Sequence, residues 1–573
     1  MNDDRELYAF TWPGKREAIL EAGRPTDKVL RPVVEESVNF EATENLYIEG
    51  DNMEAMKILQ RSYMRKVKMI YIDPPYNTGH DFIYSDDFAQ DEEESREEYG
   101  LFDGEGTRNY TMRNYRENTR ANPRYHSDWC SMIYPRLMLA HNLLRDDGVI
   151  FISIDDNEAA NLRKICDEIF GENNFVANIV WQSRTSISND YEISLNHNHT
   201  FIYAKDRPHL VFGGNPIDSS EYINPDNDPR GAWKLVPIDA NHTGGDTVYP
   251  VRNPKTGRDY YPPNGRVWCY SKAVMQKLIA DGRIKFGLAD DSSPKRKLYL
   301  SERISKGDVK TPSSLIIDAG TTQTGTNEIM GLFDGRKVFS YPKPVEFIRR
   351  LVSYGAPKGG IVLDFFAGSS TTAHAVMSLN ASDSGHRKFI MIQLPEPCPP
   401  SSEAAKAGYS TICALGRERI RRASLKLAQD FPLTAGQTDS GFRTLRVDSP
   451  NFRDVFISPD DLESLDLDSL ADNLKPDRSP LDLLFMCITD SGLPLSLSLD
   501  SENFSGFTIY TYGSGEIIAC FNECLTEDVI THIAQQKPSR AVFRNLGFQD
   551  SRTRINLEQV FKYYSPDSGM VII

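Results

Sequence analysis

The stretch YIDPPYNTG, residues 71–79, decides the fold class of this chain. It overlaps the end of a short apolar run, KVKMIYI (66–72), whose composition favours a buried β-strand. Two prolines then end the strand, because proline cannot donate a hydrogen bond to a sheet ladder. The pattern predicts a stiff loop with an acid and an aromatic residue at the carboxyl end of a strand, where open α/β sheets bind ligands.

The segments around this loop alternate between strand and helix patterns. Residues 46–59 read as strand, turn and helix, and WCSMIYPRLMLAHNLL (129–144) is helical before the strand VIFISI (149–154). This alternation predicts a largely parallel sheet. The alternation of strand and helix patterns is interrupted between residues 207 and 330 and resumes after this segment.

A chain of 573 residues is too long for one hydrophobic core. We expect a first α/β part at 1–206 with the proline loop, and an inserted irregular module at 207–330. The second α/β part then covers 331–440, and an acidic C-terminal domain covers 441–573.

Charge is distributed unevenly along the chain. The formal net charge is −16, yet residues 251–310 carry fourteen Lys or Arg against six Asp or Glu. Residues 441–573 carry eleven against twenty, and residues 86–105 contain ten acids with one arginine. The basic segment could therefore meet phosphates, while the acidic tail faces solvent or a protein.

The cysteines, the first residues and the apolar runs of the sequence indicate the cellular compartment and argue against a zinc site. Eight cysteines are scattered without the paired spacing of zinc ligands, so no metal site is expected. The sequence begins MNDDRELYAF, which lacks the features of a signal peptide, and no apolar run approaches a membrane span. A reduced, cytoplasmic protein without membrane contact is predicted.

A second strand-to-helix junction lies at LDFFAGSSTTAHAV, residues 363–376. The apolar strand ends at Asp364, and small residues form the turn before the helix. Small residues let a backbone approach a ligand closely, and a helix N-terminus adds donors. The GxGxxG fingerprint is not met, which disfavours NAD. Alone, this turn could equally be an ordinary tight turn.

Arginine and tyrosine alternate in TRNYTMRNYRENTRANPRY, residues 107–125. Phosphate pairing and base stacking make this mixture suitable for a nucleic-acid strand, and an exposed polar loop is an equal alternative. The predicted contacts here are Arg108, Arg113 and Arg116. In the inserted module, the basic run 295–297 could contact DNA or form a solvated turn.

Two motifs together resemble a known enzyme group. DPPY (73–76) and the turn FAGS (366–369) resemble the amino-methyltransferases that use S-adenosylmethionine and act on DNA. With DPPY first and the cofactor turn last, the order resembles that of the permuted β class.

Within that class, the chain resembles the modification (Mod) subunit of type III restriction–modification systems over nearly its whole length. The stretches that carry this resemblance are TWPGKREAI (11–19), DPPYNTG (73–79), HSDWCSMIYPRLMLAHNLL (126–144), YPKPVEFIRRLV (341–352) and DFFAGSSTTAHAV (364–376). The resemblance implies an α/β fold with a Rossmann-like class I methyltransferase sheet in circularly permuted motif order. It also implies an inserted target recognition domain and a separate α+β C-terminal domain for dimerisation and partner binding.

The resemblance implies methyl transfer from S-adenosylmethionine to adenine N6, in a base flipped out of double-stranded DNA. Asp73 and the Pro74 carbonyl would accept hydrogen bonds from the amine, with Pro75 stiffening the loop. Tyr76 would stack on the flipped base.

The resemblance also assigns cofactor contacts. They are Asp51, Lys343, Asp364, Phe366, Ala367, Gly368, Ser369 and Gln393. DNA contacts in the inserted module would come from Lys295, Arg296 and Lys297. The chain departs from the family pattern at two positions. Ser370 stands where a second glycine is common. Gln393 stands where an acid usually binds the ribose hydroxyls, so Gln393 or Glu396 would have to bind them here.

The implied partners are a second copy of the chain and a helicase–nuclease (Res) subunit. The sequence has no Walker A loop, so DNA cutting would require that partner. One alternative is a solitary regulatory methyltransferase acting on adenine N6 or cytosine N4. Another is a recognition subunit that binds DNA but does not methylate.

Overall fold

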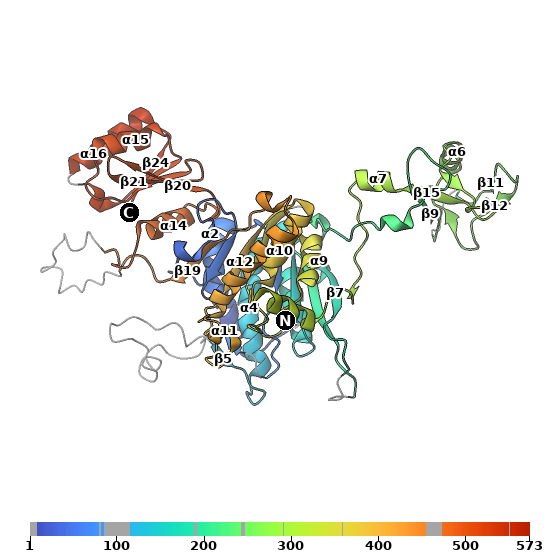
Figure 1. Cartoon of the computed structure of the whole chain (residues 1–573), viewed down its shortest axis with the longest axis horizontal. Coiled ribbons are helices and arrows are strands. Elements are labelled where there is room, and N and C mark those ends of the chain that lie inside the picture. The colour runs from blue at the N-terminus through green and yellow to red at the C-terminus, as the bar shows by residue number, and fades with distance from the viewer. Residues whose placement is uncertain are drawn as a thin grey trace, which may run out of the picture. The chain divides into compact units, whose positions relative to one another are not determined.

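The computed structural model describes residues 9–79, 82–84, 115–187, 192–241, 247–289, 291–357, 359–453, 473–548 and 551–573. This described part of the chain divides into two compact units (Figure 1). The larger unit combines the residues up to 213 with those from 313 onward, and the smaller unit comprises 214–312. Each unit has its own hydrophobic core.

A ten-stranded sheet is the centre of the larger unit. Its strands, in spatial order, are β1 (Val29–Pro32), β19 (Arg443–Asp448), β2 (Leu46–Glu49), β18 (His386–Gln393), β17 (Gly359–Asp364), β3 (Val67–Ile72), β6 (Leu144–Ile154), β8 (His197–Ala204), β7 (Phe175–Gln182) and β16 (Leu315–Ile316). From β19 to β6 all neighbouring strands are parallel. The largely parallel α/β sheet expected from the sequence is therefore confirmed.

Helices cover both faces of this sheet. One face packs against α2 (Asn52–Tyr63), α4 (Tyr125–Leu143) and α5 (Ala159–Cys166). The other packs against α8 (Thr322–Leu332), α9 (Val345–Gly355), α10 (Thr371–Asp383) and α12 (Ile412–Asp430). None of the helices in the described ranges combines the length and apolar character of a membrane span.

Strand β3 shows why the sequence folds in this way. Ile70 and Ile72 belong to the core on one face, whereas Met69 and Tyr71 belong to the core on the other. Side chains alternate along a strand, so a strand covered on both sides must be apolar throughout. This explains the apolar run MIYI (69–72) directly before the proline loop.

The C-terminal residues are built partly into the main sheet. Strand β19 lies between β1 and β2, and buried Arg443 donates to the carbonyls of Phe40 and Leu495. The remaining elements are α14 (Pro480–Asp490), β20 (Leu499–Phe504), β21 (Phe507–Tyr512), β22 (Ile517–Cys520), α15 (Glu527–Gln535), β23 (Arg540–Phe543), α16 (Ser551–Tyr564) and β24 (Gly569–Ile572). The five strands from β20 to β24 form a second sheet within the larger unit.

The smaller unit contains short strands, as the irregular sequence suggested. A three-stranded sheet has the order β14 (Ile284–Lys285), β15 (Lys295–Tyr299), β9 (Trp233–Pro237). Helix α6 (Lys272–Ala280) packs against the small hydrophobic core of this unit. The compact unit, at 214–312, covers fewer residues than the module expected at 207–330. The difference arises because β16 and α8 pack with the main sheet unit.

Candidate active site

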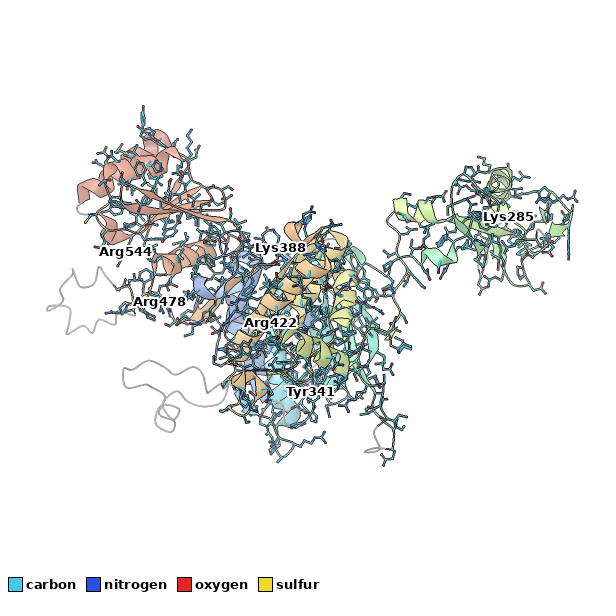
Figure 2. The ribbon with its side chains drawn as sticks, in the orientation of Figure 1. Lys285, Tyr341, Lys388, Arg422, Arg478 and Arg544 are labelled. Atoms are coloured by element: carbon cyan, nitrogen blue, oxygen red, sulfur yellow. The ribbon has the colours of Figure 1, made fainter. Side chains whose placement is uncertain are left out.

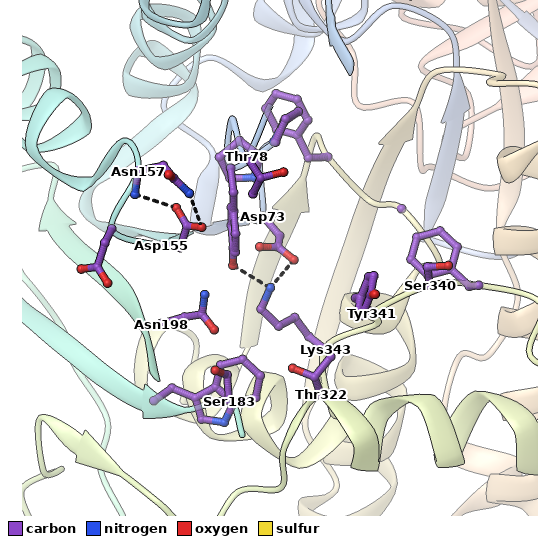
Figure 3. A pocket seen from close by; sticks show the side chains of 18 of the residues that line it. Asp73, Thr78, Asp155, Asn157, Ser183, Asn198, Thr322, Ser340, Tyr341 and Lys343 are labelled. Carbon is purple, nitrogen blue, oxygen red and sulfur yellow. Dashed lines mark hydrogen bonds and ion pairs between the residues drawn. The ribbon is translucent and has the colours of Figure 1, made fainter. Parts of the chain in front are cut away.

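A cavity of about 870 Å³ lies at the carboxyl ends of the central strands (Figure 3). Because β3 and β17 are adjacent and parallel, the loops that follow them open at the same edge of the sheet. The lining includes Asp73, Pro74, Pro75, Tyr76, Asp155, Asp156, Trp181, His197, Lys343, Phe366, Gly368, Gln393 and Glu396. The structure thus brings the proline loop and the small-residue turn to one cavity.

Asp73 forms the most prominent polar contact in this cavity. Its Oδ2 atom accepts a hydrogen bond from Lys343 Nζ at 2.5 Å, and the same ammonium donates to Tyr76 Oη at 2.8 Å (Figure 3). The other carboxylate oxygen, Oδ1, is buried and has no hydrogen-bond partner among the described residues. An unmet buried acceptor costs about 1–3 kcal/mol, so Asp73 holds an open position for a donor.

The rest of the loop is held by hydrogen bonds from neighbouring elements. Trp129 Nε1 donates to the Pro75 carbonyl at 2.8 Å. Asn77 has a positive φ of 59°, and its amide donates to Glu158 Oε1 at 2.6 Å. Because these contacts fix the loop at several points, the positions of Asp73 and Tyr76 are preorganised.

Asp364, at the end of β17, has a different environment. Its Oδ1 accepts from the Phe366 backbone N–H at 3.0 Å, and its Oδ2 accepts from Thr372 Oγ1 at 2.6 Å. Burial raises the pKa of Asp364 to about 7, although these two hydrogen bonds oppose the shift. Asp364 is not among the residues that line the cavity, so it supports the turn from behind.

The turn itself contains two left-handed residues, Gly368 with φ 51° and Ser370 with φ 63°. Gly368 lines the cavity, and its N–H donates to Gln393 Oε1 at 2.7 Å. Ser370 is fully buried, and a Cβ at Gly416 would lie 2.7 Å from its hydroxyl. The serine side chain therefore packs against α12, and the cavity keeps the room that a glycine would leave.

Comparison with known proteins identifies the family. The profile of the N6_N4 family, described as DNA methylase, matches residues 67–397, more than half of the chain. The Mod subunit of the type III restriction–modification enzyme StyLTI of Salmonella typhimurium is 38% identical, over 80% of this chain and 68% of its own. The chain belongs to the type III Mod family of DNA methyltransferases.

Two further Mod subunits extend the similarity to almost the whole chain. EcoP15I Mod of Escherichia coli is 30% identical and EcoPI Mod of Escherichia phage P1 is 32% identical, each over 98% of this chain and 90% of its own. Among solved structures, PvuII DNA methyltransferase (cytosine-N4-specific) aligns over 69% of this chain and 94% of its own with 10% identity and a TM-score of 0.30, too low to support an argument. Membership of the Mod family supports S-adenosylmethionine as the cofactor.

The structure separates the predicted cofactor residues of this Mod chain into two groups. Lys343, Phe366, Gly368 and Gln393 line the cavity, and Ala367 and Ser369 are buried in the same turn. Asp51 does not line the cavity; it caps α2 by accepting from the backbone N–H groups of Met53 and Glu54. The cofactor role of each residue remains a prediction.

Sequence reasoning missed several residues of the cavity. Trp181, near the end of β7, stacks on Phe347 with ring centroids 4.7 Å apart, and its ring centroid lies 5.9 Å from Lys343 Nζ. Thr322 is the first residue of α8, and Tyr341 comes from the segment after that helix. Strand ends were the only available signal, and that signal marks an edge of the sheet without identifying which side chains face the cavity.

The predicted DNA contacts near the N-terminal loop are only partly described. Arg108 and Arg113 lie outside the described residues. Arg116 belongs to β5 (Tyr115–Glu117), which pairs with β4 (Phe82–Tyr84), and only its backbone is described. Arg120, which belongs to the Arg- and Tyr-rich stretch 107–125, lines the cavity, as does Arg184, which the sequence did not indicate.

The basic run of the smaller unit requires a correction. Lys297 is 3% exposed, and its ammonium lies 2.7 Å from carboxylate oxygens of both Asp226 and Asp228. This lysine is therefore part of the interior and cannot contact DNA in this conformation. Strand alternation directs Arg296 to the opposite face, where it donates to Tyr270 Oη at 2.6 Å. Lys295, the first residue of the central strand β15, and Lys285, opposite it on β14 (Figure 2), are both half-buried.

Proposed function

We propose that this chain is the modification and recognition subunit of a type III restriction–modification system. Its reaction is methyl transfer from S-adenosylmethionine to the N6 amine of an adenine in double-stranded DNA. The observation that carries this proposal is the Oδ1 atom of Asp73, which has no hydrogen-bond partner among the described residues and belongs to a side chain that lines the cavity together with Tyr76. Family membership supplies the reaction class.

The chemistry explains the need for an open acceptor. The N6 lone pair of adenine is delocalised into the ring, so the amine is a poor nucleophile. Acceptors on both N–H groups favour the pyramidal nitrogen that attacks a methyl group. Asp73 Oδ1 would accept one hydrogen bond and the Pro74 carbonyl the other, because the Pro75 carbonyl is already bound to Trp129.

Lys343 would position Asp73 for this task. Its ammonium holds Oδ2 and also the Tyr76 hydroxyl, so the carboxylate cannot rotate freely. A hydrogen bond between charged groups is stronger than one between neutral groups, so this contact holds the carboxylate firmly. The adenine must leave the duplex to reach this position, and Tyr76 would replace part of its stacking.

The residues around the turn fit the cofactor. Gly368 has no side chain to fill the cavity, Phe366 and Ile412 offer apolar surface, and Gln393 and Glu396 offer acceptors for hydroxyl groups. When bound, S-adenosylmethionine supplies an electrophilic methyl group. The chain's own part is to hold the adenine amine, Asp73 and that methyl group in line.

The proposal also covers the permuted order of the motifs and the roles of the inserted unit and the C-terminal residues. The order of DPPY loop, inserted unit and cofactor turn supports a circularly permuted Rossmann-like methyltransferase. The unit at 214–312 would be the target recognition domain, and the acidic C-terminal residues would serve dimerisation and Res binding in the cytoplasm.

Methyl transfer from labelled S-adenosylmethionine to unmodified genomic DNA tests the proposal. We expect N6-methyladenine on nucleoside analysis, and its loss in Asp73→Ala. Asp146→Ala is the matched control, because Asp146 also forms a 2.5 Å ion pair, with Arg65, but lies at the surface away from the cavity. Labelled N4-methylcytosine would contradict the adenine assignment, and no transfer with both ligands bound would contradict the enzyme assignment.

A further inference from the structure

Three side chains from two neighbouring segments meet at the rim of the catalytic cavity: Asp156, His197 and His199. Their ligand atoms all lie within 4.8 Å of one another. Strand β8 brings the histidines together, because residues two apart share a face of a strand. Strand β6 pairs with β8 so that Ile154 lies opposite His199, which places Asp156 just beyond the strand end and beside both rings.

The contacts within this cluster are close. His199 Nε2 and Asp156 Oδ1 are 3.0 Å apart, and the two imidazole rings have centroids 5.0 Å apart at 89°. The Asp156 side chain is half-exposed, whereas the His199 side chain is 16% exposed. Asp156 and His197 line the cavity, so the cluster opens toward it.

Asn178 provides a second, independent observation. Its side-chain amide lies 3.0 Å from His199 Nδ1, and its Oδ1 atom is buried without a partner in the described part of the chain. Turning this amide by half a rotation would let Oδ1 accept a hydrogen bond from the Nδ1–H group. His199 Nε2 would then present its lone pair to the cluster. Metal-bound histidines usually donate their other ring N–H in this way.

We propose that Asp156, His197 and His199 bind one divalent transition-metal ion, of the zinc type, at the rim of the methyltransferase cavity. Two imidazoles and one carboxylate suit zinc and similar ions, whereas Mg²⁺ and Ca²⁺ prefer oxygen ligands. At metal–ligand distances of 2.0–2.1 Å, tetrahedral ligand atoms lie roughly 3.4 Å apart. Small side-chain rotations would close the observed cluster to that spacing.

Three protein ligands leave one position of a tetrahedral ion open. That position would face the cavity, where it could hold water or a phosphate oxygen. The phosphate part rests on the proposed function, since it requires a DNA strand at this rim. Metal binding itself does not depend on it. Sequence spacing gave no sign of this site, because the ligands come from two segments without a zinc motif.

Titration of the full-length, metal-stripped protein with Zn²⁺ and Co²⁺ tests the proposal in the absence of DNA and S-adenosylmethionine. We expect one equivalent per chain by calorimetry, with a Co²⁺ visible absorption band that Zn²⁺ removes. Asp156→Asn, His197→Ala and His199→Ala should each weaken binding at least tenfold, and His199→Cys, which keeps a zinc ligand, should retain more affinity than His199→Ala. Because Asp156 is half-exposed, its variant is least able to disturb folding.

His209→Ala is the matched control. His209 Nδ1 lies 2.7 Å from Asp206, so it forms a similar histidine–carboxylate pair without a third ligand among the described residues. Binding unchanged in this variant, but lost in the cluster variants, would support the site. Absence of stoichiometric binding, binding insensitive to His197 and His199, or equal preference for Mg²⁺ would overturn it. Any of these results could occur with methyl transfer intact, so failure here is distinct from failure of the proposed function.

Discussion

Two aspartates end neighbouring parallel strands of this protein, and the sheet gives them different roles. Asp73 follows β3, is partly exposed to the cavity, and keeps one oxygen without a partner. Asp364 ends β17, is 2% exposed, and has both oxygens bound by its own turn. The comparison shows that the availability of the carboxylate oxygens, and not the position at a strand end, distinguishes a reacting group from a supporting one.

The largest expected effect separates the two aspartates directly. Asp73→Asn should lower the rate of methyl transfer at least 100-fold, because the amide presents fewer acceptor sites to the amine and less charge to Lys343. Asp364→Asn keeps an oxygen for the Phe366 N–H and should stay within about tenfold of wild type. Initial rates of labelled methyl transfer, with cofactor and DNA at saturation, measure both. Equal losses in the two variants would remove the distinction.

Lys343 sharpens the comparison, since it forms an ion pair with Asp73, whereas in the described part of the chain Asp364 accepts hydrogen bonds only from neutral groups of its own turn. Lys343→Met should lower transfer by roughly tenfold to a hundredfold, because the Asp73 carboxylate and Tyr76 lose the group that positions them. Single-turnover kinetics on the full-length chain measure the chemical step. Lys337→Met serves as the control, because Lys337 lies near the cavity rim over the Tyr341 ring without contacting Asp73. A control loss as large as that of Lys343→Met would argue against positioning.

The raised pKa of Asp364 predicts that this residue makes the unfolding free energy depend on pH. Its pKa is raised from 3.8 to about 7 in the folded protein, so between these values the folded state binds the proton more tightly than the unfolded state. This group's contribution should therefore make the protein less stable as pH rises from about 4 to about 7, with no further change above. The difference in unfolding free energy between wild type and Asp364→Asn, followed across pH 5–8, measures it. A difference that stays constant across this pH range would contradict the prediction.

The smallest expected effect concerns the turn that Asp364 supports. Ser370 has φ 63°, a conformation that costs about 1 kcal/mol for a residue with a side chain. Ser370→Gly should stabilise the protein by up to ~1 kcal/mol in chemical unfolding and leave the transfer rate near wild type. Ser378→Gly, within α10, should instead destabilise it by ~1 kcal/mol. Destabilisation by Ser370→Gly would show that packing of the serine against α12 outweighs the backbone strain.

Much of the site was predictable because its main motifs are local. The apolar run with Pro-Pro predicts a strand and a stiff loop, and β3 ends at Ile72 as that pattern requires. The small-residue turn similarly predicts the junction of β17 and α10. The contact between Lys343 and Asp73 was not predictable in this way, since the two residues are 270 positions apart.

In the inserted unit at 214–312, the sequence did not predict which basic side chains are exposed. Three consecutive basic residues suggested one surface, but β15 is a strand with alternating faces. Lys297 therefore points toward the carboxylates of Asp226 and buried Asp228, while Arg296 lies on the other side. A charge run identifies a basic segment without showing which of its members reach solvent.

The sequence by itself determined the alternation of strands and helices, the loop at Asp73, the turn at Gly368 and the resemblance to Mod subunits. These features depend on residues that are neighbours along the chain, where backbone propensity and side-chain spacing act directly. Only the tertiary structure decided which oxygen of Asp73 stays open, which lysine is buried, and that Asp156 meets His197 and His199. Those outcomes depend on strand order and packing, which set distances between segments that the sequence keeps far apart.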